Sequence, residues 1–298
     1  MKINGVRIDP TFAEAFPMKA TRMIITATNL KWATIAAQTL TGFATSVIAC
    51  GCEAGIEREL SAEETPDGRP GVSVLMFAMD DKGLAKQVET RAGQCALTSC
   101  TAALFAGVYS DTSIPLGKNL RFFGDGYQIS KVIGGRRYWR IPVMNGEFVV
   151  EEKTGVVKGI GGGNFLILAR TRLQALAACE VAVEAMRRVP NIVMPFPGGV
   201  VGSGSKVGSK YPFLHVSTNE AFCPTLKGLV DSQLDPEIES VMEIVIDGLS
   251  EEDIRTAMRV GIRAACTLGP ENGICRISAG NYGGKLGPYH FPLQEILA

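Results

Sequence analysis

The chain has 298 residues, a length that suits one large or two medium domains. Its 30 basic residues balance its 30 acidic ones, which excludes a global positive field that would draw in nucleic acid. Charged residues make up only 20% of the chain and apolar residues 46%, a composition that indicates a sizeable core or a large subunit interface.

The cysteines and histidines argue against a metal or disulfide protein. Eight cysteines occur without metal-ligand spacing, and the only histidines are His215 and His290. Residues 1–10 do not resemble a signal peptide, and no apolar run reaches the roughly 18 residues of a membrane helix. We therefore expect a cytoplasmic protein with reduced thiols, no bound metal, and neither a membrane nor a nucleic acid as partner.

The first half of the chain predicts two βαβ-like passages. Residues 30–40 are rich in alanine and carry Trp32 and Ile35 on one side, which is typical of an amphipathic helix, and Asn29 can cap it. A Pro-Asp-Gly turn lies within residues 65–71. The predicted elements, in order, are a half-buried strand 2–8, a short segment 12–16, a core strand 23–26, the helix 30–40, a strand 46–49, a loop 50–57, a strand 72–79, a helix 84–91 and a strand or turn 93–97.

The second half repeats this order, which indicates an internal duplication. Seven segments of the first half correspond, in the same order, to seven segments of the second half. The pairs are 23–27 with 165–169, 30–40 with 173–187, 47–48 with 192–194, 50–57 with 195–210, 74–78 with 243–247, 84–91 with 251–263, and 93–95 with 264–266. The predicted fold class is α+β, with two ferredoxin-like (split βαβ) lobes whose antiparallel-rich sheets have helices packed on them. The lobes are placed at 1–153, with core 23–100 and added strands 118–150, and at 154–298, with core 165–280.

The added strands include a basic segment with aromatic residues, at 136–140. Residues 120–127, 137–143 and 147–150 are predicted as strands, separated by Gly-rich turns. Two aromatic rings among arginines can stack on a nucleic-acid base, but such a segment is more often one solvated strand face in a neutral protein.

Two glycine-rich stretches are the candidate ligand-binding segments. Residues 195–210 follow a short apolar run and match neither a Walker A loop nor a dinucleotide fingerprint. Glycines there allow a backbone to approach a polar or anionic group, although a tight connection would look the same. Residues 277–287 form the second stretch, which the repeat places close to the first. The candidate binding residues are Gly199, Ser203, Gly204, Ser205, Lys206, Lys210, Asn281, Tyr282 and Lys285.

The carboxylates are the candidates for acid–base chemistry. Glu243 interrupts the apolar strand 241–246, so it lies either on the wet face of a sheet or in a desolvated place that raises its pKa. Glu53 and Glu57 fall in the predicted loop 50–57, and Asp67 and Arg69 lie in the Pro-Asp-Gly turn. No nucleophile with an evident base is visible.

Several long strings at these positions occur together in one known family. They are T-G-F-A-T-S-V-I (41–48), E-A-G-I-E (53–57), E-T-P-D-G-R-P-G (64–71), P-F-P-G-G-V-V (195–201), S-G-S-K (203–206) and R-I-S-A-G-N-Y-G-G-K-L-G (276–287). With them the chain resembles formylmethanofuran–tetrahydromethanopterin formyltransferases over nearly its whole length. Residues 50–53, C-G-C-E, depart from the archaeal pattern. With L-K-W-A (30–33) and G-R-R-Y-W-R (135–140), they look more like bacterial members, which are similar to one subunit of a formyltransferase/hydrolase complex.

The resemblance implies two α+β lobes, a homo-oligomer (dimer or tetramer) built from dimers with substrate clefts near subunit contacts, and further partner subunits in a formyltransferase/hydrolase complex. It implies transfer of a formyl group between formylmethanofuran, or a related furan carrier, and N5 of tetrahydromethanopterin, both of them substrates and neither a tightly bound cofactor. Glu243 is then the expected catalytic acid/base, and the binding residues above, with Glu53, Glu57, Asp67 and Arg69, contact the carriers. The alternatives are a non-catalytic scaffold subunit of such a complex and a ferredoxin-like RNA-binding module.

Overall fold

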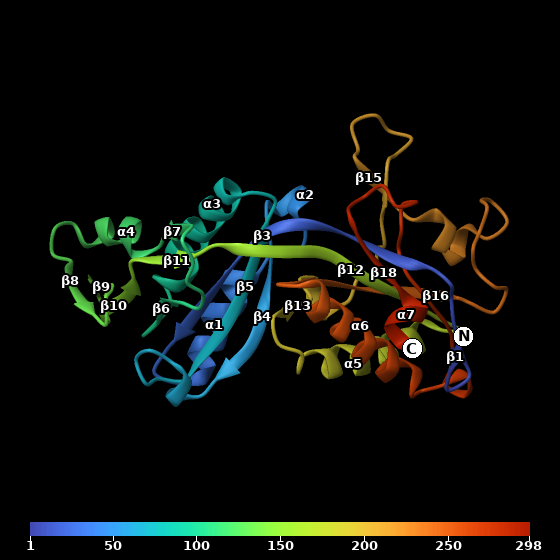
Figure 1. The fold of residues 1–298 in the computed structure, drawn as a ribbon, viewed down its shortest axis with the longest axis horizontal. Helices are drawn as coiled ribbons and strands as arrows, with labels where there is room; N and C mark the ends of the chain where they lie inside the picture. Colours follow the sequence, from blue (N-terminus) through green and yellow to red (C-terminus); the bar gives the residue numbers. More distant parts are fainter. The chain divides into compact units, whose positions relative to one another are not determined.

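The computed structural model describes residues 1–298 as two compact units (Figure 1). Unit 1 consists of residues 1–17 and 160–298, and unit 2 of residues 18–159. The expected lobes 1–153 and 154–298 therefore differ from these units in two ways: residues 1–17 belong to unit 1, and the later boundary falls between residues 159 and 160. Strand β2 (Val6–Ile8) pairs in parallel with β17 (Ile274–Ser278), and the first part of β3 (Phe12–Thr26) pairs with β18 (Tyr289–Pro292), so strand pairing holds residues 1–17 in unit 1.

The sheet of unit 2 has four antiparallel strands in the order β4, β5, β3, β6. Helices α1 (Leu30–Thr41) and α3 (Asp81–Arg91) contribute Ala33, Leu40 and Leu84 to its core, where they meet alternate residues of the strands. Asn29 and Asp80 cap the two helices, as their short polar side chains favour. The other strands are β4 (Glu53–Leu60), β5 (Gly71–Ala78) and β6 (Ala103–Ala106).

Two sequence-based assignments in unit 2 are wrong. Residues 46–49 are not a strand: Ser46 caps the short helix α2 (Val47–Cys50), and Gly51, at φ +74°, ends it. The predicted loop 50–57 is mostly strand β4, which is held by its pairing with β5. As expected, residues 12–16 lead into the core strand 23–26: both belong to one strand, β3, which stays extended through Pro17.

The remainder of unit 2 forms a hairpin extension. Strand β6 pairs in parallel with β10, which continues antiparallel to β9 and then β8. The predicted strand 120–127 is wrong: residues 120–124 are helical, and residues 125 and 126 form a turn. The elements are β7 (Ser113–Pro115), α4 (Gly117–Leu120), a 3-10 helix (Arg121–Gly124), β8 (Ile129–Ile133), β9 (Arg136–Val143), β10 (Gly146–Glu151) and β11 (Lys153–Gly155), with a π-helix (Ala92–Ala96) and a 3-10 helix (Ala62–Glu64) earlier in the unit.

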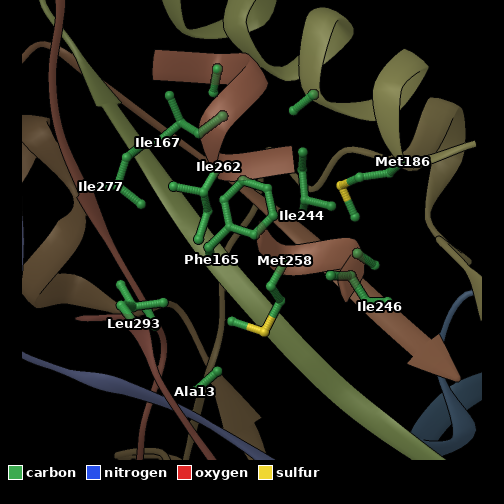
Figure 2. Packing of buried hydrophobic residues seen from close by; sticks show 14 of the residues in the cluster. Ala13, Phe165, Ile167, Met186, Ile244, Ile246, Met258, Ile262, Ile277 and Leu293 are labelled. Carbon is green, nitrogen blue, oxygen red and sulfur yellow. The ribbon is translucent and has the colours of Figure 1, made fainter. Parts of the chain in front are cut away.

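Unit 1 repeats the sheet order of unit 2. Its strands run β13, β16, β12, β17, all antiparallel, and helices α5 and α6 cover one face. Phe165 and Ile244 from the sheet meet Met186 and Ile262 from the helices in a buried apolar core (Figure 2). The elements are β12 (Val157–Ala169), α5 (Arg172–Met186), β13 (Ile192–Val193), β16 (Ser240–Gly248) and α6 (Glu251–Cys266), followed by β17.

The opposite face of this sheet is covered by the long connection between β13 and β16. Leu166 and Leu168 point to this face and pack with Ile238 and Phe222. The connection holds only short elements: β14 (Lys206–Val207), β15 (Val216–Ser217) and 3-10 helices at Pro197–Gly199, Glu220–Phe222 and Pro224–Leu226. The remaining elements of unit 1 are β1 (Lys2–Ile3), a 3-10 helix (Pro270–Asn272) and α7 (Leu293–Leu297). No helix of the chain is both long and apolar enough to cross a membrane.

Candidate functional site

A cavity of about 160 Å³ lies in unit 1, on the sheet face that the helices leave uncovered. Its floor comes from β12 and β16, and its other walls come from the connection between β13 and β16 and from the start of the 280–287 segment. The lining residues include Leu166, Val201, Gly202, Ser203, Gly204, Ser205, Asn219, Phe222, Cys223, Val241, Glu243 and Gly280.

Glu243 is the acidic residue of this cavity. Successive side chains of a strand point to opposite faces, so Ile244 enters the helix-covered core while Glu243, opposite Leu166, points to the other face. Both alternatives predicted for Glu243 thus apply in part. It lies on the sheet face that carries no helices, as the wet-face alternative expects, but loops cover that face. No hydrogen bond or ion pair within the chain engages the Glu243 carboxylate, and burial raises its pKa to about 7.

The first glycine-rich stretch forms a wall directly beside Glu243. The N–H of Val201 donates to the Glu243 carbonyl at 2.8 Å, and the N–H of Glu243 donates to the Val201 carbonyl at 3.0 Å. After this two-way bridge the chain turns away, with Gly204 at φ +59°. The N–H groups of residues 202–205 donate no hydrogen bond within the chain. They are therefore backbone donors beside an unpaired acid.

The second glycine-rich stretch reaches the first through Tyr282, as the repeat predicts. The Tyr282 hydroxyl donates to the Ser205 carbonyl at 3.2 Å. Burial raises the pKa of Tyr282, and the nearby Glu243 carboxylate adds to this rise. Asn281 is turned away from the cavity, because its amide donates to the Thr11 hydroxyl at 2.7 Å.

The three lysines predicted to bind the carriers differ in whether they form ion pairs within the chain. Lys206 forms an ion pair with Glu220, and its ammonium lowers the pKa of that carboxyl. Lys210 and Lys285 are exposed on the two glycine-rich stretches, and neither forms an ion pair within the chain. Gly199, at φ +85°, packs against Val183 below the loop, so its role is in folding the loop rather than in the cavity.

The remaining predicted site residues lie in unit 2. Both oxygens of Glu57 accept from Arg22, at 2.7 and 2.6 Å, and Ser73 donates to Glu57 at 2.7 Å. Glu53 is buried and accepts from the Val47 N–H at 3.1 Å, which ties it to the start of α2. These contacts occupy both carboxylates within the fold.

Asp67 and Arg69 form a partly exposed pair in the turn before β5. The Arg69 Nε donates to Asp67 at 2.8 Å, and both side chains bond to the Thr26 hydroxyl. Arg69 also donates to the Thr101 carbonyl at 2.7 Å. The pair stiffens the turn and leaves about a third of the Arg69 side chain exposed.

Several residues near the cavity had not been predicted from the sequence. Asn219, Phe222 and Cys223 line it from the connection before β16, whose path the sequence pattern does not indicate. Glu14 lies in the apolar surroundings of Ala13 and Ala15, so it carries the same signal as Glu243: a carboxylate that interrupts an apolar strand. No group of three or more His, Cys, Asp or Glu side chains that could hold a metal ion is present.

Comparison with known proteins covers both halves of the chain. The family model described as "Formylmethanofuran-tetrahydromethanopterin formyltransferase" matches residues 1–143, and the model "FTR, proximal lobe" matches residues 146–296. A formylmethanofuran–tetrahydromethanopterin formyltransferase from Methylococcus capsulatus is 74% identical over 298 residues, covering 100% of both chains.

Two solved structures are also similar over their full length. One is a chain of the formyltransferase/hydrolase complex FhcABCD from Methylorubrum extorquens in complex with methylofuran, with TM-score 0.97, 48% identity and coverage of 100% of this chain and 99% of that one. The other is the formylmethanofuran:tetrahydromethanopterin formyltransferase from Methanosarcina barkeri, with TM-score 0.95, 47% identity and coverage of 99% and 100%. These matches agree with the mixed α+β, two-lobed fold.

Proposed function

Because this chain belongs to the formylmethanofuran–tetrahydromethanopterin formyltransferase family, we propose that the Glu243 cavity is where its formyl transfer takes place. The chain is a formyltransferase that moves a formyl group between formylmethanofuran and tetrahydromethanopterin. The observation that carries the assignment is the half-buried Glu243 carboxyl, which has a pKa that burial raises to about 7, no partner within the chain, and free backbone donors beside it.

Formyl transfer between two amines needs proton movement. The attacking amine forms a C–N bond to the formyl carbon, the carbonyl oxygen takes up negative charge, and the attacking nitrogen must lose a proton. When the second C–N bond breaks, the leaving nitrogen must gain one. A group whose pKa of about 7 lies near neutral pH can accept the first proton and return it to the leaving nitrogen, and Glu243 has this property.

The tetrahedral adduct also needs donors for its oxyanion. The N–H groups of residues 202–205 are not used within the chain and lie along the wall that Val201 bridges to Glu243. Fixed backbone donors in a site partly closed to water stabilise a developing negative charge without reorganising. We assign the oxyanion contacts to this wall.

The carriers bring polar and anionic groups that the loop side chains can receive. Ser203, Ser205 and Tyr282 supply hydroxyls at or beside the cavity, and the exposed Lys210 and Lys285 supply positive charge. We assign carrier binding to these five residues. For Asp67 and Arg69 of unit 2, the role of carrier contact stays a prediction, while Glu53 and Glu57 are assigned to the stability of unit 2.

The shared strand order supports a finer description of the fold. If the four sheet strands of each unit are numbered 1 to 4 along the chain, their order across the sheet is 4-1-3-2, and all neighbours are antiparallel. In each unit both helices contribute to one apolar core. This is the split βαβ, or ferredoxin-like, arrangement. We infer that the two units are ferredoxin-like lobes derived from one duplicated ancestor.

The relatives also support a quaternary proposal. The similar chain from Methylorubrum extorquens belongs to the FhcABCD complex. We propose that this chain forms a homo-oligomer and associates with other subunits of a formyltransferase/hydrolase complex, with a furan carrier such as methylofuran as its formyl donor or acceptor.

An assay of the purified chain with both carriers tests the function. The chain is incubated with formylmethanofuran and tetrahydromethanopterin, and the formyl product on each carrier is measured in both directions. Turnover that depends on both carriers is expected. A purified chain that binds the carriers without turnover would contradict the proposal and favour a scaffold subunit, and salt-sensitive RNA binding without turnover would favour an RNA-binding module.

A further inference from the structure

Glu14 is a fully buried carboxylate that binds backbone N–H groups of the second glycine-rich stretch. It lies on β3 within unit 1, and its side chain has 0% exposure. Its Oε1 accepts from the N–H groups of Tyr282, at 2.5 Å, and Gly284, at 2.6 Å. Its Oε2 accepts from the N–H of Leu286 at 2.8 Å.

Alternate N–H groups of one short segment thus converge on a single acid. Gly283 and Gly284 make this possible, because their φ values of +71° and +76° turn the backbone into a concave row of donors. Such a nest normally holds a bound anion, and here the anion is the side chain of the protein itself.

The charge of Glu14 is stabilised where it lies. Burial acts to raise its pKa, but the hydrogen bonds from Leu286, Tyr282 and Gly284 outweigh burial, and His290 on the adjacent strand adds to them, so the pKa is lowered. An ionised carboxylate holds three N–H donors more firmly than a neutral amide would, since charge-assisted hydrogen bonds are roughly twice as strong.

The segment that Glu14 holds leads to the Glu243 cavity. Gly280, which lines the cavity, is anchored from the sheet: its N–H donates to the Asn164 side chain at 2.7 Å. Tyr282 is the first residue whose N–H donates to Glu14, and its hydroxyl bonds to Ser205 in the wall of residues 202–205. Buried Asn164 and Glu14 thus fix the two ends of residues 280–286, which we call the arm.

We propose that Glu14 is a positioning residue: its carboxylate holds residues 282–286 so that Tyr282 braces the wall beside Glu243 and limits the access of water to that half-buried carboxyl. The proposal rests on the proposed function only in giving Glu243 its catalytic role. Glu14 itself does not line the cavity. Its effect on the reaction passes through Tyr282 and the hydration of Glu243.

The direct test measures the titration of Glu243 in the full chain. Glutamate side chains are labelled with ¹³C, the Glu243 carboxyl signal is assigned by its absence in Glu243→Gln, and its midpoint is compared between wild type and Glu14→Gln. The amide introduced by Glu14→Gln would face three N–H donors with only one acceptor oxygen, so the arm should loosen and water should reach Glu243. We expect the midpoint to fall from about 7 toward 4.5, by about one pH unit or more.

Two further variants separate positioning from general stability. Ile262→Val, in the helix-covered core, should lower the melting temperature while leaving the Glu243 midpoint unchanged. Glu14→Asp keeps the charge and should retain the wild-type midpoint better than Glu14→Gln. If Glu14→Gln does not fold, Tyr282→Phe removes the hydroxyl that bonds to Ser205 and, measured without carriers, should still lower the midpoint.

The outcomes distinguish this proposal from the proposed function. An unchanged Glu243 midpoint in folded Glu14→Gln, or in Tyr282→Phe, would overturn the positioning role whatever the kinetics show. A lowered midpoint supports that role even if Glu243→Gln proves fully active, in which case only the catalytic assignment of Glu243 fails. If both hold, the limb of the pH–rate profile that depends on Glu243 should move with the midpoint in Glu14→Gln.

Discussion

Glu243 of unit 1 and Glu57 of unit 2 both project from strands of four-stranded sheets with the same strand order, yet their surroundings are opposite. Glu57 accepts from two nitrogens of Arg22 and from the Ser73 hydroxyl. Glu243 has no partner for its carboxylate, and burial raises its pKa to about 7. Although an acidic side chain stands on a strand in both, only one is free for proton transfer.

The comparison shows how a repeated fold can separate stability from reactivity. A carboxylate that is saturated by a guanidinium and a hydroxyl is held charged, and it adds to the free energy of unfolding. A desolvated, unpaired carboxylate costs stability when it is charged, but its pKa comes close to the working pH. Strained or costly groups of this kind are commonly found at functional sites.

The largest expected effect comes from replacing Glu243. Glu243→Gln keeps the shape but removes the titrating proton, so kcat should fall by about 10²–10⁴-fold while the KM values of the carriers change little. The measurement is steady-state kinetics with both carriers. Glu239→Gln, an exposed residue just before the same strand, is the matched control and should stay within about twofold of wild type. Wild-type kcat in Glu243→Gln would remove the catalytic assignment.

The second prediction concerns the stability cost of the same residue. The folded chain keeps the Glu243 proton up to about pH 7, whereas the unfolded chain loses it near 4.5, so stability should fall as pH rises between these values. The shift corresponds to at most roughly 3 kcal/mol above pH 7. Glu243→Gln should therefore be more stable than wild type at pH 8 but nearly equal to it at pH 4.5. Urea unfolding at both pH values tests this, and a difference independent of pH would contradict it.

The third prediction concerns Glu57 of unit 2, where we expect a replacement to lower stability but not activity. Glu57→Gln weakens bonds to a charged partner and leaves Arg22 poorly paired, so we expect a loss of about 2 kcal/mol in unfolding free energy. The kcat of the folded fraction should change by less than about twofold. The exposed Arg140–Glu147 pair is the matched control, because Glu147→Gln should cost under about 0.5 kcal/mol. A large loss of kcat with unchanged stability would instead make Glu57 a carrier contact.

The smallest expected effect concerns the exposed lysines of the glycine-rich stretches. Lys210→Ala and Lys285→Ala each remove a positive charge without disturbing an ion pair. Surface charge contacts contribute about 0.2–1 kcal/mol, so the KM of one carrier should rise by roughly 1.5–5-fold at low salt, and less at high salt. Lys2→Ala, an exposed lysine on β1 that does not line the cavity, should leave both KM values unchanged. A salt-independent rise would contradict an electrostatic role.

Local sequence patterns already determined much of this protein. Long strings such as those at 195–201 and 276–287 identify the family, and the two-lobed α+β fold follows from it. Helices with caps, such as α1 after Asn29, are predictable because the side chain that starts them is adjacent in sequence. Glu243 stands out for a similar reason: a charge within an apolar strand is a local signal.

Tertiary structure alone decided the rest. Residues 53–60 could have been strand or loop, and their antiparallel pairing with β5 settles that they form a strand, whereas residues 47–50 form helix α2 instead of the expected strand. Only the folded chain shows that Arg22 neutralises Glu57 while nothing pairs with Glu243. Glu14 meets its donors 268 to 272 residues away, and no sequence pattern reports such a contact. A pKa depends on burial and on neighbours in space, and the order of residues along the chain specifies these only through the fold.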